Sequence, residues 1–352
     1  MIFSDNQSPE IYSQNNYKPE IQASIMEPKI LVSEEDIINT YSKAEQFSCQ
    51  KYFEYQKLMQ ENPSFGYKKC AKFLSIKQGQ VRWWHTKGAK RAIPLPLKVT
   101  QKLKEVGLLP FNENHKDAEI IFNILGTLFG DGGIDIRFNT VAFISSDKRD
   151  VDLWHSDLLR IFPFAQGKTQ IVEGGEYGHS YNIRCYDRAV VRFFAALGAP
   201  VGSKIVTDYS LPKYFSELKG RSYRAFFDGL FSSEIAIPRF VKTKYITDYF
   251  KNFSLSLSKA EFLEQSHLAF MNAIKHYSKK IGIKCTAIVK KDKYRNEPRK
   301  DGHHTHGYRI FFRTNMGNAL FFNKIFPLCY SAAKKEKLQK EVEFCIQHNP
   351  PT

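Results

Sequence analysis

Two acidic residues follow apolar, glycine-containing stretches of the sequence at matching intervals. Residues 124–133 read ILGTLFGDGG and residues 227–237 read FDGLFSSEIAI, and in each stretch an acid, Asp131 or Glu234, lies five positions after a glycine. The apolar runs predict helices. A helix ends in unpaired carbonyls and the negative pole of its dipole, so an acid there needs a compensating positive charge. Carboxylate oxygens are preferred ligands of Mg²⁺. We therefore predict that Asp131 and Glu234 bind Mg²⁺, for which Mn²⁺ can substitute.

Small residues predict how two helices bring these acids together. Gly126 and Gly130 on the first helix, and Gly229 and Ser233 on the second, are spaced four apart and therefore lie on one face. Small residues on facing helices let two backbones cross closely. We expect Gly126 and Gly229 to pack at the crossing. We also expect the carbonyl groups of Gly130 and Ser233 to help the acids to hold the ion.

The larger part of the chain is predicted to contain an internal repeat, with residues 113–218 as the first copy and 219–352 as the second. In each half the acid is followed by strand-like alternation, a helix, a second pair of strands and a closing helix. The segments YNIR at 181–184 and YRIF at 308–311 occupy equivalent places. The pattern predicts a duplicated α+β fold in which each half has a four-stranded antiparallel sheet covered by helices.

The residues before the two repeats predict a tail and a small helical domain. Residues 1–34 are polar and rich in Asn, Gln, Ser and Pro, which is typical of a flexible tail. Residues 35–112 are predicted to hold a helix-turn-helix, because small and apolar side chains have the spacing of two helices packed across a short turn. These side chains are Ala71, Ser75, Ile76, Val81 and Trp84. The outward face would contact bases and phosphates of DNA through Lys77, Gln78, Gln80 and Arg82.

Composition indicates the kind of partner. The chain has 352 residues and a formal net charge of +16, and this charge is not confined to one tail. Such an excess favours a polyanion, with nucleic acid as the first candidate. No apolar stretch is long enough to span a bilayer and no signal peptide is recognisable, so we expect an intracellular protein without a membrane partner. The six cysteines form no CxxC pair, which predicts reduced thiols.

The paired glycine-containing helices with their terminal acids resemble the LAGLIDADG homing endonucleases in the single-chain, two-repeat form. The resemblance extends from about residue 118 to the C-terminus. It implies that Gly126 and Gly229 pack the helices, that Asp131 and Glu234 are catalytic acids, and that two sheets form a saddle on double-stranded DNA. It also implies a catalytic lysine after the closing helix of each half. Lys204 is similar to the first of these lysines, and Lys335 is expected to be the second, with Lys334 as the alternative.

The sheets are expected to read a long asymmetric site on double-stranded DNA, bound by a monomer. Strand-like segments carry the basic side chains proposed to contact it. They are Arg137, Arg184, Lys242, Lys244, Lys284, Lys290, Arg309 and Arg313. The histidines of DGHHTHGYR, at 303, 304 and 306, are interpreted as part of an exposed or DNA-facing loop and not as metal ligands.

One departure from the family pattern leaves alternative functions open. Ile235 follows Glu234, where the family has glycine, and a β-branched residue resists the left-handed backbone that glycine allows at the end of a helix. The preferred function is a divalent-metal-dependent endonuclease that hydrolyses both strands of DNA. The alternatives are a DNA-binding transcription regulator that has lost cleavage and an intron RNA maturase. The host element, whether an intron, an intein or a free-standing gene, stays open.

Overall fold

The computed structural model describes residues 28–86, 93–174, 179–236, 240–241, 249–250, 253–291, 298–299, 301–312 and 330–348. The helices are α1 (Glu34–Asn39), α2 (Lys43–Glu61), α3 (Tyr67–Leu74), α4 (Gln78–His85), α5 (Leu95–Glu105), α6 (Ala118–Phe129), α7 (Lys148–Ile161), α8 (Arg188–Ala196), α9 (Gly220–Glu234), α10 (Glu264–Lys280) and α12 (Ala332–His348). The strands are β1 (Ile30–Val32), β2 (Phe111–Asn112), β3 (Gly133–Ile134), β4 (Val141–Ser145), β5 (Thr169–Glu173), β6 (Tyr181–Cys185), β7 (Ile235–Ala236), β8 (Phe240–Val241), β9 (Tyr249–Phe250), β10 (Phe253–Ala260), β11 (Cys285–Lys290) and β12 (Thr305–Phe312). Short 3₁₀ turns cover Pro163–Ala165, Lys213–Glu217 and Glu261–Leu263.

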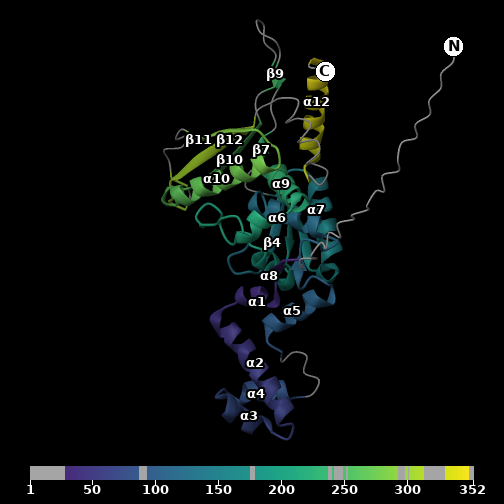
Figure 1. The fold of residues 1–352 in the computed structure, drawn as a ribbon, viewed down its shortest axis with the longest axis vertical. Helices are drawn as coiled ribbons and strands as arrows, with labels where there is room; N and C mark the ends of the chain where they lie inside the picture. Colours follow the sequence, from purple (N-terminus) through teal and green to yellow (C-terminus); the bar gives the residue numbers. More distant parts are fainter. Residues whose placement is uncertain are drawn as a thin grey trace, which may run out of the picture.

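Two four-stranded sheets have the same strand order. The first is β3-β4-β6-β5 and the second is β7-β10-β12-β11, so in both the last strand of the four lies between the second and the third. All neighbouring strands within these sheets are antiparallel. In Figure 1 the second sheet lies above and to the left of the first. The expected α+β fold with small antiparallel sheets is therefore confirmed.

The helix pair α6–α9 forms the centre of the molecule (Figure 1). Every residue of α6 except Glu119 is buried, which follows from its sequence, because a helix that is apolar around its whole circumference must be enclosed. Helix α7 packs on β4 and β6 of the first sheet, and α10 packs on the three longer strands of the second. The shared core is rich in Phe side chains, with Phe129 in contact with Phe226 of α9 and stacked on Phe270 of α10.

The N-terminal helices divide between two hydrophobic cores. Helices α1 and α5 pack on α8 and contribute to the large core that also lies under both four-stranded sheets. Helices α2, α3 and α4 enclose a separate small core with Leu58, Leu74 and Val81 at its centre, and they project at one end of the long axis (Figure 1). Within residues 1–34, expected to be a flexible tail, Ile30–Val32 form strand β1, which pairs with β2. The range 35–112 therefore contributes to two cores and is not a single packed unit.

The turn between α3 and α4 contains a residue in the left-handed conformation, Ser75 at φ 55°. The small side chain expected there occupies the C-cap of α3, and the backbone amide of Ile76 donates to the carbonyl of Ala71. Val81 is fully buried, and Trp84 packs edge-on against Tyr52 of α2. A helix, a short turn and a second helix are thus present.

Cys49, Cys70, Cys185 and Cys285 are free thiols, and the first three are buried. Free thiols at these four positions agree with the predicted reduced cysteines. Across the described ranges, no helix combines the length and the apolar character that crossing a membrane requires.

Candidate metal and nucleic-acid site

Two glycines lie where α6 and α9 cross. A Cβ atom added to Gly126 would lie 2.0 Å from the backbone oxygen of Phe226, and one added to Gly229 would lie 1.9 Å from that of Asn123. Neither position therefore accepts a side chain without separation of the helices. The amide of Asn123 also donates across the crossing to the carbonyl of Ala225, at 3.3 Å. The crossing is as close as the sequence predicts.

The two acids follow their helices in different ways. Helix α6 stops at Phe129, and Asp131 lies in the turn beyond it, whereas α9 continues through Glu234 and leads directly into β7. The turn after α6 is fixed by the carbonyl of Thr127, which accepts from the backbone amides of Gly130 at 3.0 Å and Gly132 at 2.8 Å. Helix α7 reinforces it, because the indole of Trp154 donates to the hydroxyl of Thr127 at 3.1 Å.

Ile235 does not disturb the end of α9. Its backbone is extended, with φ −77° and ψ 129°, and its side chain is buried. A β-branched residue adopts this conformation readily, so the helix can end here without a glycine in the left-handed region. The end of α9 lies close to the end of α6, because a Cβ added to Gly130 would lie 2.4 Å from the Cβ of Ser233.

The carboxyl groups influence each other electrostatically. Burial, followed by the charge of Asp131, raises the pKa of Glu234 to about 7. The pKa of Asp131 is also raised by burial, even though solvent reaches this side chain from one side. Lys204 and Lys334 lower both pKa values in part. In the absence of a cation, the site therefore resists holding two negative charges at once.

Lys204 binds the carbonyl groups at the end of α6. Its ammonium donates to the carbonyl oxygen of Gly132 at 2.7 Å and to that of Leu128 at 3.4 Å. The segment that carries it is held against β3, because the amide of Gly202 donates to the carbonyl of Ile134 at 2.8 Å. Burial lowers the pKa of Lys204 to about 8, against the opposing effect of Glu234 and Asp131.

Lys334, the alternative to the preferred Lys335, binds the end of α9 as Lys204 binds the end of α6. The ammonium of Lys334 donates to the carbonyl of Ser233 at 2.6 Å and also to that of Ser232. The two lysines are adjacent on α12, and the charge of Lys334 lowers the pKa of both acids, which favours Lys334 over the preferred Lys335. The carbonyl of Ser233, which is predicted to help hold the metal ion, thus accepts a hydrogen bond from Lys334.

Helix α12 is held in place by the first repeat. The buried carboxylate of Asp150 on α7 accepts from the backbone amide of Ala332 at 3.1 Å and from the hydroxyl of Ser145 at 2.8 Å. The hydroxyl of Tyr330 donates to Asp157, also on α7, at 2.8 Å. Lys334 is thus held near the acids by contacts between α7 and the start of α12. These elements are far apart in sequence, so no local sequence pattern predicts the contacts. A cavity of about 340 Å³ between α7, α12 and the helix ends opens beside Asp131.

The predicted DNA contacts do not all lie on one surface. Arg184 on β6 and Arg309 on β12 point away from the helix-covered faces, and the guanidinium of Arg309 lies 5.5 Å from the centre of the Phe311 ring. Lys290 points to the opposite face of its sheet, where it pairs with Glu264 of α10, so its predicted role as a sheet-face contact is wrong. Arg137 is exposed in the β3–β4 turn and Lys284 is exposed before β11. Lys242, Lys244 and Arg313 lie outside the described residues.

Lys291 is a basic residue near the acids that is not among the predicted DNA contacts. Lys291 follows β11, and its side chain passes over Gly307 on the outer face of the second sheet. Burial and then the charge of Arg309 lower the pKa of Lys291, and its charge in turn lowers the pKa of Glu234. Successive side chains of a strand point to opposite faces of the sheet. Because Lys290 points to the helix-covered face, the next residue, Lys291, points to the outer face, and strand alternation could have predicted this.

On α4, three of the four predicted contacts are free to face a partner. Lys77, Gln78 and Arg82 are exposed. The amide of Gln80 instead donates to the hydroxyl of Ser48 on α2 at 3.1 Å, which fixes the helix to its neighbour.

The histidine cluster separates into two parts. His303 and His304 are exposed, as expected for a loop. His306 belongs to β12 and is buried, with its Nε2 3.1 Å from Nδ1 of the fully buried His267. The expectation of an exposed loop is therefore wrong for His306, because it occupies the inward-facing side of a strand.

Comparison with known proteins gives relatives of partial coverage. No family model matches the chain. The chain is 29% identical over 200 residues to the tRNA-splicing ligase RtcB of Methanocaldococcus jannaschii, a match that covers 50% of this chain and 19% of the ligase. It is 25% identical over 255 residues to the DNA-directed RNA polymerase subunit Rpo1N of the same organism, covering 69% of this chain and 18% of the subunit. The chain thus spans about a fifth of the length of the curated relatives it matches.

Among solved structures, the chain is similar to homing endonucleases. The structure of I-DmoI in complex with DNA and Mn is 16% identical, with a TM-score of 0.38, and the match covers 60% of this chain and 98% of that one. The I-SmaMI LAGLIDADG homing endonuclease bound to cleaved DNA is 11% identical, with a TM-score of 0.37, and the match covers 65% and 89%.

Proposed function

We propose that this protein is a divalent-metal-dependent endonuclease that cuts both strands of double-stranded DNA at a long asymmetric site. The observation that carries this proposal is the pair Asp131 and Glu234 at the ends of two closely crossing helices, each helix end bound by a lysine. Residues 113–218 and 219–352 are the two repeats of this arrangement. Each repeat supplies one acid, one lysine and one four-stranded sheet.

The donor set fits a divalent cation. Two carboxylates approach each other at helix ends that already carry negative partial charge, and the pKa of Glu234 rises to about 7 in the absence of a counter-charge. Hard oxygen ligands of this kind suit Mg²⁺ or Mn²⁺ better than a softer ion that prefers nitrogen and sulfur. Among the described residues no group of three or more His, Cys, Asp or Glu side chains gathers at one point. The remaining ligands would therefore be water and the phosphate oxygens of DNA.

The acids and the lysines would have different roles in phosphodiester hydrolysis. Divalent cations would supply Lewis-acid stabilisation of the attacking and leaving oxygens. Asp131 and Glu234 would hold the cations and orient the scissile phosphates. Lys204 and Lys334 already bind backbone carbonyls, so their charges are fixed at the site before DNA arrives and would stabilise charge that develops on the phosphoryl oxygens.

The two sheets and the α3–α4 unit are proposed to read the DNA. The outer faces of the sheets carry Arg184 and Arg309 but few acids, and small side chains such as Ser254 and Ser256 on β10 leave room for a duplex. The exposed Lys77, Gln78 and Arg82 of α4 would contact a further stretch of the site. Because one chain contributes both halves, the protein would act as a monomer on an asymmetric sequence.

The relatives support a module that occurs in unrelated hosts. A ligase and a polymerase subunit have no activity in common by their names, yet this chain matches a segment of each that is at most a fifth of its length. We infer that the matched segment is a transferable unit. This agrees with an endonuclease that propagates an intron or intein.

Cleavage of a randomised double-stranded DNA library would test the proposal. Purified protein would be incubated with and without Mg²⁺, beside the double variant Asp131→Asn, Glu234→Gln and a control, Asp208→Asn, which removes an exposed carboxylate outside the site. We expect site-specific, metal-dependent double-strand breaks with the wild type and the control but none with the double variant. Breaks that persist in the double variant would contradict the assignment of the acids.

A second candidate is a DNA-binding regulator without cleavage. It is favoured by the α2–α4 unit, whose separate hydrophobic core and exposed basic face would suffice for binding. Tight, site-specific binding of DNA without breaks, in Mg²⁺ and in Mn²⁺, would select this candidate. Binding of a structured intron RNA in preference to duplex DNA would select the maturase.

A further inference from the structure

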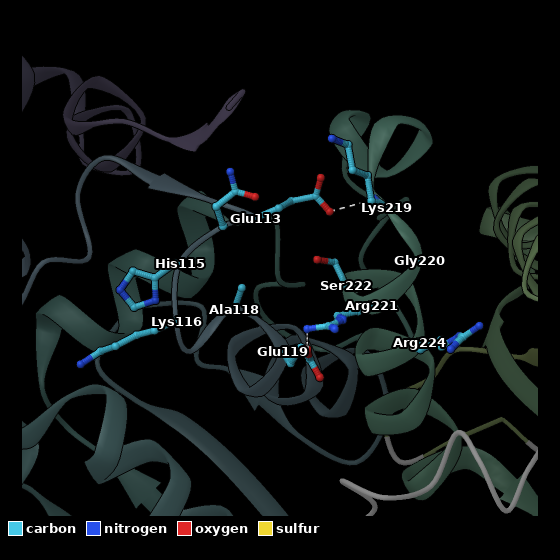
Figure 2. Close-up of a pocket in the computed structure, with 11 residues that line it drawn as sticks. Glu113, His115, Lys116, Ala118, Glu119, Lys219, Gly220, Arg221, Ser222 and Arg224 are labelled. Carbon is cyan, nitrogen blue, oxygen red and sulfur yellow. Dashed lines mark hydrogen bonds and ion pairs between the residues drawn. The ribbon is translucent and has the colours of Figure 1, made fainter. Parts of the chain in front are cut away.

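A cavity of about 590 Å³ lies at the end of the α6–α9 pair opposite the acids (Figure 2). Both helices begin in its wall, α6 at Ala118 and α9 at Gly220. The two helices run side by side in the same direction, from this cavity to Asp131 and Glu234. The geometry that joins two negative helix ends at the acids therefore joins two positive helix ends here.

Neither helix is capped by the side chain of its own N-cap residue. The N-cap residues are Asp117 and Lys219, and the side chain of neither accepts a hydrogen bond from the first turn. Helices of 12 and 15 residues have several first-turn amides that lack a partner within the helix. Such amides, together with the dipole, bind oxyanions.

A buried hydroxyl points into the cavity. Ser222, in the first turn of α9, is only 4% exposed and lines the cavity wall. Figure 2 shows its oxygen directed into the space between Glu113 and Arg221. None of the described residues forms a hydrogen bond with this hydroxyl. The residue is 4% exposed but its oxygen borders the cavity, so the hydroxyl can donate to an acceptor oxygen of a ligand there.

The charges around the cavity favour an anion. The basic side chains that line it are Lys116, Lys219, Arg221 and Arg224, and the acidic ones are Glu113 and Glu119. Glu113 accepts from the backbone amide of Lys219 at 2.8 Å, and Glu119 lies 3.6 Å from the guanidinium of Arg221. Across the part of the chain that the structure describes, Lys116, Lys219 and Arg224 form no ion pair.

We propose that this cavity binds a small ligand through a phosphate monoester or inorganic phosphate group. The paired helix starts and the hydroxyl of Ser222 would hold the phosphoryl oxygens, and Arg224 with Lys219 would balance their charge. The cavity is larger than phosphate requires and lies within the range of small-molecule sites, roughly 300–1,000 Å³, so a nucleoside monophosphate would also fit. The site is separate from the acids and does not depend on DNA cleavage.

Calorimetric titration of the full chain would test the site, with inorganic phosphate and a deoxynucleoside 5′-monophosphate as probes. The variants are Ser222→Ala, which removes the inward hydroxyl, and Arg224→Ala, an exposed change that leaves the core intact. The control is Arg188→Ala, which removes an exposed arginine at the start of α8, where Asp187 already caps the helix. Thermal unfolding without ligand would establish that each variant is folded.

We expect one phosphate per chain, with binding about tenfold weaker in Ser222→Ala and Arg224→Ala and unchanged in Arg188→Ala. Tighter binding of the nucleotide would identify a nucleotide site, and equal binding would identify a phosphate site. No saturable binding of either probe, or equal binding by all variants, would overturn the proposal. Dependence on these residues for duplex DNA alone would also overturn it. The double variant Asp131→Asn, Glu234→Gln should bind the probes like the wild type, which separates this test from the test of cleavage.

Discussion

Substitution of Gly229 by alanine should destabilise the fold and disable the proposed site together. The new Cβ would lie 1.9 Å from the backbone oxygen of Asn123, and relief to an ordinary contact of about 3.4 Å requires the helices to separate by about 1.5 Å. The obstacle is backbone on a buried helix, so no side chain can rotate away. Overpacking of a core costs about 1–3 kcal/mol, and we expect a loss near the upper end, about 3 kcal/mol in the free energy of unfolding.

The same movement would separate Asp131 from Glu234, because both lie one turn beyond the crossing. A misplacement of about 1 Å can reduce the rate of a reaction about 100-fold, so cleavage should fall further than stability alone explains. Urea unfolding followed by circular dichroism measures the first effect, and cleavage at a temperature where the variant is folded measures the second. Gly220→Ala is the matched control on the same helix, since nothing lies within 4 Å of its added Cβ. A Gly229→Ala protein within about 0.5 kcal/mol of the wild type would refute the close crossing.

Three further predictions concern residues outside the helix crossing. Lys334→Met should lower the rate of DNA cleavage about 100-fold, because the charge that acts on both acids is lost, whereas Lys335→Met should leave the rate within about threefold of the wild type. Burial, and then the charge of His306, lowers the pKa of His267 from 6.5 to about 4. The unfolded chain therefore binds the proton first, and stability should fall by up to roughly 3 kcal/mol as the pH drops from about 6.5 to 4, with a shallower slope in His267→Gln, measured by urea unfolding at each pH. Asp187→Ala should cost about 2–3 kcal/mol in the same assay, because it leaves two lysines without their shared carboxylate and removes the cap of α8.

Residue spacing was enough to predict the centre of the molecule. The glycines at 126 and 229 indicated a close crossing, since only small residues at facing positions permit it, and strand alternation indicated two antiparallel sheets. Both signals are local and periodic. Predictions from these two patterns hold in the structure because the burial of α6 and of the inner strand faces depends on the pattern of apolar residues more than on any single partner.

The residues that the sequence left undetermined depend on contacts between distant elements. Lys334 and Lys335 are adjacent in the same basic run, and only the anchoring of α12 to Asp150 of α7 decides which of them reaches the acids. Lys290 was expected on the outer face, but the register of β11 with β12 turns it toward Glu264. His306 is similar, because the nearby His303 and His304 are exposed, whereas His306 is buried against His267 on α10.

The lysines explain how the chain can fold around two acids without a cation. Each ammonium binds carbonyls at or just beyond the end of one helix, so it neutralises the negative pole directly and leaves the carboxylates as the remaining excess charge. The negative charge that remains on the two carboxylates can be balanced by one proton, as the raised pKa of Glu234 indicates. Binding of divalent cations would then displace the proton, and the apparent affinity for Mg²⁺ should increase as the pH rises through about 7. A metal affinity that is independent of pH between about 6 and 8 would mean that Glu234 is already ionised in the free protein.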